Sequence, residues 1–203
     1  MKKTMLLGVV VSIPLFGAAL VPLADRSGRG SEAAQPEGDM EGMPGMPPPP
    51  GEHHAWLDQL VGEWRVESDM GQGPDAEPLV GVDTVRSIGG RWVVCEMRSD
   101  VPGMGPMHAV MTLGYNPETG TYQGTWVDSV HDHLWIYEGT LDDAGNVLTL
   151  EAEGPNMMDP AGGTAMYRDV IEFKSENHRT LTSFAQIEGE WVQFATAQYR
   201  RAE

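Results

Sequence analysis

The feature that most constrains the fold is a succession of short β-prone segments, each bounded by turn residues, and it is clearest in residues 108–141. An apolar run there is followed by a turn, in which Pro117 fixes the backbone and Gly120 can close a hairpin. Two aromatic-rich segments with two-residue periodicity follow, at residues 121–128 and 133–141. The stretch therefore predicts three antiparallel strands with two connections.

The same pattern extends over the C-terminal three quarters of the chain. A short helix is expected at residues 52–61, where apolar side chains recur at helical spacing and Gly62 follows. Strands are expected at residues 63–68, 79–88, 91–99, 108–115, 121–128, 133–141, 147–153, 164–173, 179–187 and 191–199. Roughly ten short, evenly spaced strands favour an all-β, closed, antiparallel up-and-down barrel, because closure leaves no strand edge exposed. A β-sandwich is the alternative.

Three parts of the chain differ in composition. Residues 1–24 combine Lys2 and Lys3 with a long apolar run, which is typical of a secretory signal peptide. Residues 25–52 are a Gly-, Pro- and Met-rich linker, too poor in apolar side chains to fold. Residues 53–203 form the predicted barrel domain. We therefore expect an exported protein, in the periplasm or outside the cell, without a stable membrane span after cleavage.

Charge and cysteine content exclude some functions. The formal net charge is −17, and subtracting +2 for the signal and −4 for the linker leaves −15 for residues 53–203. Such an acidic surface repels phosphate backbones, so nucleic acid is not an expected partner. Cys95 is the sole cysteine, which excludes an intrachain disulfide, and its neighbours Val93 and Val94 indicate a core residue rather than a nucleophile.

The opening of the domain resembles that of a known class of barrels. The helix followed by Gly62-Glu63-Trp64 resembles the Gly-x-Trp opening of the calycins, which comprise lipocalins, fatty-acid-binding proteins and nitrobindin-like proteins. In lipocalins an arginine of the last strand stacks on this tryptophan. Arg200 and Arg201 are placed to do so, and we assign Arg200 as the partner, with Gly62 and Trp64 as the other structural residues.

A second resemblance is more specific. The segments VRSIGGRWVV (85–94), MTLGY (111–115), GTWVDS (124–129), WIYEGTL (135–141) and YRDVIEF (167–173) resemble a bacterial family of unknown function with a predicted calycin-type barrel. The resemblance covers about residues 53–201 and implies the barrel fold without a reaction or ligand.

Charged residues between apolar neighbours are candidates for the interior. Glu96, Arg168 and Asp169 have this setting, and a charge inside a barrel is costly unless it is paired or meets a ligand. Arg168 is placed to pair with Glu96 or Glu138, to bind a ligand carboxylate, or to lie on the solvent face. The candidate ligand-binding residues are Glu96, Trp126, Trp135, Tyr137 and Arg168.

The link between the strands at 121–128 and 133–141 supplies candidates for chemistry at the barrel rim. The candidate catalytic residues are Asp128, His131, His133 and Tyr137. His131 and His133, at i and i+2, would share a face of a strand as two ligands of a divalent metal must, and Asp128 could complete the site. The adjacent His53 and His54 are expected to face solvent.

Four functions follow from these patterns. The first is a non-enzymatic, lipocalin-like barrel that binds a small apolar ligand. The second is a hydrolase or isomerase with a rim site. The third, by analogy with nitrobindin-like barrels, is haem binding with His108, His133 or His178 as the proximal ligand. The fourth is an interaction module on a tether. The pattern leaves the ligand and the oligomeric state open.

Overall fold

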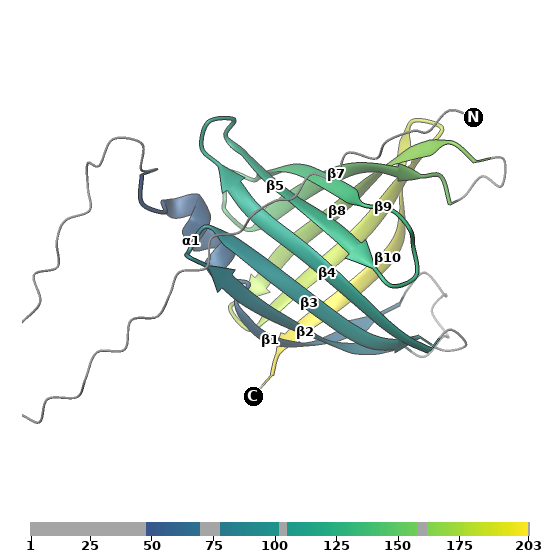
Figure 1. Cartoon of the computed structure of the whole chain (residues 1–203), viewed down its shortest axis with the longest axis horizontal. Helices are drawn as coiled ribbons and strands as arrows, with labels where there is room; N and C mark the ends of the chain where they lie inside the picture. Colours follow the sequence, from purple (N-terminus) through teal and green to yellow (C-terminus); the bar gives the residue numbers. More distant parts are fainter. Residues whose placement is uncertain (1–47, 70–77, 102–104, 158–161, 203) are drawn as a thin grey trace, which may run out of the picture. The chain divides into compact units, whose positions relative to one another are not determined.

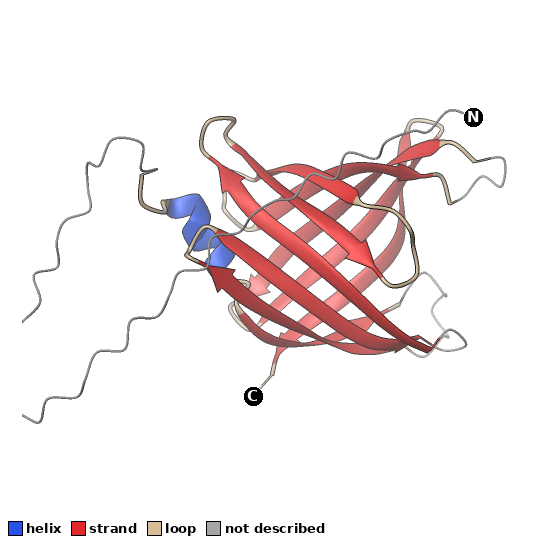
Figure 2. Cartoon of the chain, in the orientation of Figure 1, coloured by secondary structure: helices blue, strands red, loops and turns tan. Residues whose placement is uncertain are grey.

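The described residues of the computed structural model, 48–69, 78–101, 105–157 and 162–202, form one helix and ten strands. The elements are α1 (Glu52–Asp58), β1 (Gly62–Ser68), β2 (Leu79–Ile88), β3 (Trp92–Val101), β4 (Gly105–Asn116), β5 (Thr121–Asp128), β6 (Trp135–Leu141), β7 (Val147–Pro155), β8 (Thr164–Ser175), β9 (His178–Ile187) and β10 (Glu190–Arg201). They enclose a barrel with α1 at one end (Figure 1). Most of this domain is strand, as Figure 2 shows.

The sheet is closed, and each strand pairs antiparallel with its neighbours in the chain. The first and last strands complete the circle, with Trp64 of β1 opposite Arg201 of β10. The predicted up-and-down barrel is confirmed, and a β-sandwich is excluded because it would leave β1 and β10 unpaired. The predicted signal peptide and most of the linker lie outside the described residues, and Glu52 belongs to α1.

Strand side chains alternate between the interior and the outer face. In β2, Leu79, Asp83 and Val85 are buried, whereas Val80 and Val82 between them are exposed. This two-residue period is the one that the sequence predicted. The buried side chains of all ten strands form the core of the barrel.

The helix covers one end of the barrel through aromatic contacts. Trp56 packs edge-on against Tyr122 and Phe173, and its Nε1 donates a hydrogen bond of 2.9 Å to the carbonyl oxygen of Gly145. Among the residues that the structure describes, no helix is long and apolar enough to cross a lipid bilayer.

The two histidines at the start of α1 also pack on the barrel. The His53 ring stacks on Tyr115 with centroids 4.1 Å apart, and His54 is 6% exposed with its ring edge-on to Tyr115. The expectation that both histidines face solvent is wrong, because the first turn of α1 directs both rings onto Tyr115 at the end of β4.

An arginine clamp closes the floor of the barrel beneath α1. The guanidinium of Arg201 lies 4.3 Å from the ring centroid of the fully buried Trp64. It donates hydrogen bonds to the carbonyl oxygens of Val61 (2.7 Å), Gln59 (2.8 Å) and Glu176 (3.0 Å). These bonds join the loop after α1 to the end of β10 and to the turn between β8 and β9.

The clamp also explains the glycine of the Gly-x-Trp motif. Gly62 has φ +131°, and a Cβ atom there would lie 2.6 Å from Nη1 of Arg201. The assignment of Arg200 as the partner of Trp64 is wrong, because Arg201 is opposite Trp64 in the ladder while Arg200 points outward.

A buried ion pair lies above this floor. Nη2 of Arg179 donates a 2.9 Å hydrogen bond to Oδ2 of Asp83, and the two side chains are 3% and 4% exposed. The Arg179 guanidinium also lies 3.7 Å from the ring centroid of Tyr199. Burial raises the pKa of Asp83, and the attraction of Arg179 opposes that rise.

We predict that Arg201→Ala lowers the free energy of unfolding by about 2–3 kcal/mol, because it removes charge-assisted hydrogen bonds and the stacking on Trp64. Urea unfolding followed by tryptophan fluorescence measures the change. The matched control, Arg200→Ala, removes an exposed guanidinium and should change the free energy by less than about 0.5 kcal/mol. Equal effects of the two substitutions would contradict the clamp.

Candidate functional site

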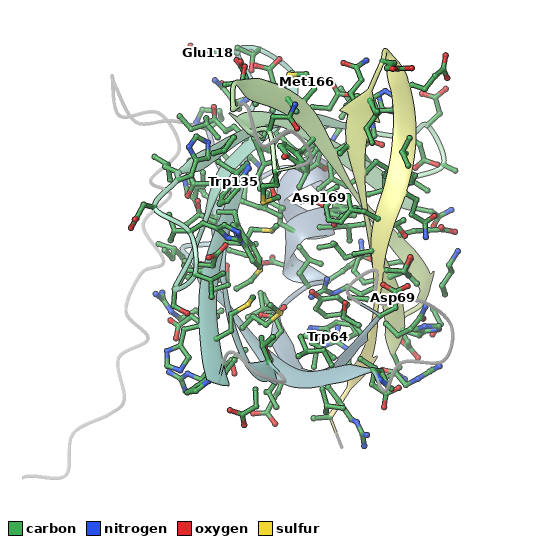
Figure 3. The ribbon with its side chains drawn as sticks, turned by 90° about the vertical axis from the view of Figure 1, so that its right-hand side faces the viewer. Trp64, Asp69, Glu118, Trp135, Met166 and Asp169 are labelled. Carbon is green, nitrogen blue, oxygen red and sulfur yellow. The ribbon has the colours of Figure 1, made fainter. Side chains whose placement is uncertain are left out.

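The half of the barrel distant from α1 contains a cavity of about 220 Å³. Six aromatic side chains contribute to its wall: Trp126, Trp135, Tyr137, Tyr167, Phe194 and Tyr199. Most of the other lining side chains are aliphatic or methionine. Figure 3 looks along the barrel and shows Trp135 and Asp169 projecting from the wall into its interior.

Polar side chains in the wall are few, as is typical of sites for small molecules. They are Ser68, Ser99, Asp128, His131, Asp169 and Ser183. No lysine or arginine is among the described residues that line the cavity. The wall therefore combines a large apolar area with two carboxyl groups.

Asp169, on β8, is the buried carboxyl group. The hydroxyl of Tyr137 donates a 2.5 Å hydrogen bond to Oδ2, and the hydroxyl of Ser183 donates a 2.5 Å bond to Oδ1. Burial raises the pKa of Asp169, and the bonds from these neutral hydroxyls only partly offset that rise. In the described part of the chain, no ion pair joins Asp169 to a basic side chain.

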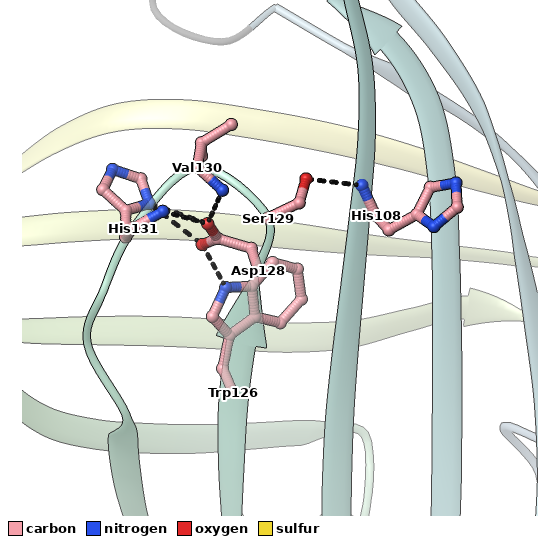
Figure 4. Close-up of polar contacts among 6 residues, drawn as sticks. All are labelled: His108, Trp126, Asp128, Ser129, Val130 and His131. Atoms are coloured by element: carbon pink, nitrogen blue, oxygen red, sulfur yellow. Dashed lines mark hydrogen bonds and ion pairs between the residues drawn. The ribbon is translucent and has the colours of Figure 1, made fainter.

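Asp128, at the end of β5, is the second carboxyl group, and Figure 4 shows its contacts. Oδ1 accepts 2.9 Å bonds from the backbone N–H groups of Val130 and His131, and Oδ2 accepts a 3.0 Å bond from Nε1 of Trp126. Nδ1 of His131 lies 3.0 Å from both carboxylate oxygens. Burial alone would raise the pKa of Asp128, but these hydrogen bonds outweigh burial and the pKa is lowered.

The four predicted catalytic residues lie in three different settings. Asp128 and His131 are in contact at the cavity, whereas Tyr137 is bonded to Asp169. His133 turns away, with Nε2 lying 3.3 Å from the carbonyl oxygen of Glu153. The sequence pattern did not anticipate this division.

The geometry predicted for a metal site is not formed. β6 begins at Trp135, so His131 and His133 lie in the connection rather than at alternate positions of a strand. Each ring instead packs edge-on against Trp135, with centroid distances of 5.3 and 4.8 Å. Within the described ranges, no three or more His, Cys, Asp or Glu side chains form a group that could hold a metal ion.

Three of the five ligand-binding candidates line the cavity: Trp126, Trp135 and Tyr137. Their role in binding stays a prediction. Trp135 fits against β7 because residue 154 is glycine, where a Cβ atom would lie 2.4 Å from the indole Nε1. The β6–β7 ladder ends at Glu138 and Glu151, so Trp135 fills the wall where the two strands are no longer paired.

The prediction that Glu96 faces the interior is wrong. Its side chain is 43% exposed on the outer face, 3.8 Å from Arg86. Trp92 and Val94, which suggested an inward face, point outward with it, and Trp92 packs over Gly114 of the neighbouring strand. Because apolar side chains also pack on the outside of the barrel, the apolar neighbours of Glu96 indicated the wrong face of β3.

Of the alternatives for Arg168, the structure shows the solvent face, so its selection as a ligand-binding residue of the interior is wrong. On the outer face, Arg168 forms an ion pair of 2.5 Å with Glu151, and its guanidinium lies 3.9 Å from the Trp191 ring centroid. Its predicted partners were Glu96 and Glu138. Asp169 is the inward charge of this strand, and its place between Tyr167 and Ile171 was the available signal, although it was not among the selected site residues.

The histidines proposed as haem ligands do not line the cavity. His108 is exposed on the outer face of β4, and Nε2 of His178 lies 2.7 Å from Oε1 of Gln198. His133 contacts Glu153 as described, which leaves His131 as the histidine of the wall among the described residues. A volume of 220 Å³ is also below the roughly 300–1,000 Å³ of pockets for drug-sized ligands.

Cys95 is a core residue, as predicted. It is buried, and burial, with repulsion from Asp83, raises the pKa of its thiol to about 12. The thiol therefore stays protonated at neutral pH and is a poor nucleophile.

The fold and the cavity define a class: closed, ten-stranded antiparallel barrels with a partly hollow interior. The sequence profile of a family described as a protein of unknown function (DUF1579) matches residues 49–201. The chain belongs to this family, which confirms the resemblance drawn from the sequence. No curated protein matches the chain.

Solved structures share the barrel. Rv2717c from M. tuberculosis is 14% identical, with 76% of this chain and 99% of that chain covered and a TM-score of 0.52. A redesigned β-barrel is 8% identical, with coverages of 72% and 94% and a TM-score of 0.39. The barrel mFAP2b bound to DFHBI is 11% identical, with coverages of 73% and 98% and a TM-score of 0.40. Only the likeness to Rv2717c has a TM-score above 0.5, and at 14% identity it concerns the fold alone.

The hydrogen bonds to Asp128 predict a pH dependence of stability. Its pKa is lowered by folding, so its contribution is present above the unfolded value of about 3.9 and is lost as the pH falls through the lower folded pKa. We expect the difference in unfolding free energy between the wild type and Asp128→Asn to be constant between about pH 7 and 5 and to shrink below about pH 4.

Urea unfolding at a series of pH values measures this difference. The control is Asp132→Asn, which removes an exposed carboxylate from the same connection. A difference that stays constant down to the lowest accessible pH would show that the charge of Asp128 contributes nothing to folding.

Proposed function

We propose that this barrel binds a small, mostly apolar molecule in the cavity distant from α1. The observation that carries the proposal is the cavity itself, about 220 Å³ of space whose wall combines aromatic, aliphatic and methionine side chains with a few polar groups. The opposite half of the barrel is filled by Trp64 and the Asp83–Arg179 pair. The filled half can serve as a rigid base, and the hollow half can serve as the binding site.

The size of the cavity limits the ligand and its affinity. A ligand that buries about 200 Å² of apolar surface gains about 5 kcal/mol at roughly 25 cal/mol per Å², before the losses of association. Even before those losses are subtracted, about 5 kcal/mol corresponds to a dissociation constant of roughly 0.2 mM, so a purely apolar molecule binds no more tightly than that. Tighter binding would require the polar groups of the wall.

Export is part of the proposal. The charged and apolar start of the chain and its Pro-rich linker support a mature barrel that acts in the periplasm or outside the cell. Under this proposal the barrel binds its ligand outside the cytoplasm, where the chain is synthesised before export.

Mass spectrometry of protein exported from a bacterial host tests both statements. A mass excess in the native spectrum, absent in the denaturing one, is the expected result for a bound ligand. The denaturing mass reports the mature N-terminus, and a mass that retains residues 1–24 would contradict cleavage.

A cavity-filling variant provides the matched comparison. Ala197→Phe places a ring where Ala197 lines the cavity and should abolish the mass excess, whereas Val110→Phe adds the same ring on the exposed outer face and should preserve it. Binding of tert-butylbenzene, followed by the indole N–H signals in ¹H–¹⁵N NMR spectra, extends the comparison to protein that carries no ligand. An unaffected Ala197→Phe variant would exclude the cavity as the site.

The contact between Asp128 and His131 favours a second candidate, a hydrolase at the cavity rim. A carboxylate at Nδ1 orients an imidazole so that Nε2 can act as a general base. The expected result is hydrolysis of p-nitrophenyl esters that is lost in His131→Gln and retained in His133→Gln. Wild-type protein that hydrolyses none of a series of such esters would remove this candidate.

A further inference from the structure

We propose that the cavity selects organic cations, namely amines or quaternary ammonium compounds with an apolar body, and that the positive charge of the ligand lies against Asp169 among the aromatic rings of the wall. This inference rests on the proposed binding function of the cavity and names the chemical class of its ligand.

The aromatic rings are the first observation. Six of them line a space of about 220 Å³, and they come from four different strands: Trp126, Trp135, Tyr137, Tyr167, Phe194 and Tyr199. The faces of such rings carry negative potential, and ammonium groups bind within aromatic cages for this reason. A neutral hydrocarbon gains burial from these rings, whereas a cation gains burial and the electrostatic attraction.

The second observation is the uncompensated carboxyl group of Asp169. Its two described hydrogen bonds come from the neutral hydroxyls of Tyr137 and Ser183. Each carboxylate oxygen can accept a further bond, so the group retains capacity on the cavity side. A buried carboxylate without a counter-charge is unfavourable, and a bound cation supplies that counter-charge.

Asp83 and Asp169 differ in whether a basic side chain balances their charge. Asp83 is more fully buried than Asp169, but it is paired with Arg179 in the layer below the cavity. The chain therefore contains its own cation for Asp83, while Asp169 has none among the described residues. A bound cation would pair with Asp169 as Arg179 pairs with Asp83.

The other carboxyl group of the cavity wall has the same sign as Asp169. Asp128 adds a carboxylate to the wall, and hydrogen bonds lower its pKa, so it is ionised at neutral pH. The whole chain has a formal net charge of −17, which favours the approach of cations. A ligand with a carboxylate, such as a fatty acid, would instead meet Asp169 and Asp128 without a lysine or arginine in the described wall to bind it.

A buried hydroxyl adds a polar contact for the ligand. Oγ of Ser99, on β3, has no hydrogen-bond partner among the described residues, and Ser99 lines the cavity. Burying a hydroxyl without a partner is unfavourable, so a ligand that donates to it or accepts from it relieves this loss. An N–H group of an amine is one such donor.

The test compares three probes of similar shape and different charge: phenyltrimethylammonium, its neutral isostere tert-butylbenzene, and the anion benzenesulfonate. Dissociation constants are measured on the purified protein by ¹H–¹⁵N NMR titration, in which the indole N–H signals of Trp126 and Trp135 report on the cavity. We expect the ammonium probe to bind at least about tenfold more tightly than the isostere, and the sulfonate not to bind.

Two variants assign the preference to Asp169. Asp169→Asn keeps the size of the side chain and removes its charge, so it should abolish the tenfold preference while the isostere binds as before. Glu96→Gln removes one acidic charge from the outer face and should preserve the preference, which controls for the overall charge of the protein. The spectrum of each variant reports whether it is folded.

The outcomes separate this inference from the proposed function. If the isostere binds as tightly as the ammonium probe, or if folded Asp169→Asn retains the preference, the inference fails and the apolar binding site stands. If neither probe binds the folded wild-type protein, both fail. The comparison of probes on the wild type decides the inference even if Asp169→Asn does not fold.

Discussion

The pairing of β1 with β10 is the contact on which the rest of the structure depends, because it converts a row of hairpins into a closed wall. This pairing places Trp64 opposite Arg201, whose guanidinium stacks on the indole. The same guanidinium binds carbonyl groups of the connection between α1 and β1 and of the turn between β8 and β9. Without closure the barrel would have two exposed strand edges and no enclosed interior. The arginine clamp therefore stabilises the end of the barrel at α1. Because it lies where β1 and β10 close the sheet, it also supports the enclosed interior that contains the cavity.

The interior is divided into two halves with different chemistry. Toward α1, Trp64, Tyr199 and the Asp83–Arg179 pair fill the space, and the buried charges neutralise each other. Away from α1, the wall encloses space and carries Asp169 with neutral partners. Asp83 and Asp169 thus have different surroundings: Asp83 is paired with Arg179 in the base, and Asp169 lies at the cavity with neutral hydrogen-bond partners.

The residues at the barrel rim show which parts of the candidate site the local sequence pattern could predict. The prediction that the connection after β5 carries polar side chains at the cavity holds for Asp128 and His131, which are neighbours in the chain. Tyr137 and Asp169 are 32 positions apart and meet because β6 and β8 both face the interior, with only β7 between them in the wall. No spacing within a single segment predicts such a pair, so the sequence pointed to Tyr137 without its partner.

The sequence by itself determined the number of strands, their approximate limits, the barrel and the family, because turn residues and two-residue periodicity are local properties of the chain. The tertiary structure decided which face of each strand is inside. Glu96 and Arg168 were selected as charges between apolar neighbours, and Arg200 by resemblance to lipocalins. All three lie outside, since apolar side chains such as Trp92 also cover the outer wall. Parity follows from the register of each strand against its neighbours, and that register is fixed only when the ring closes.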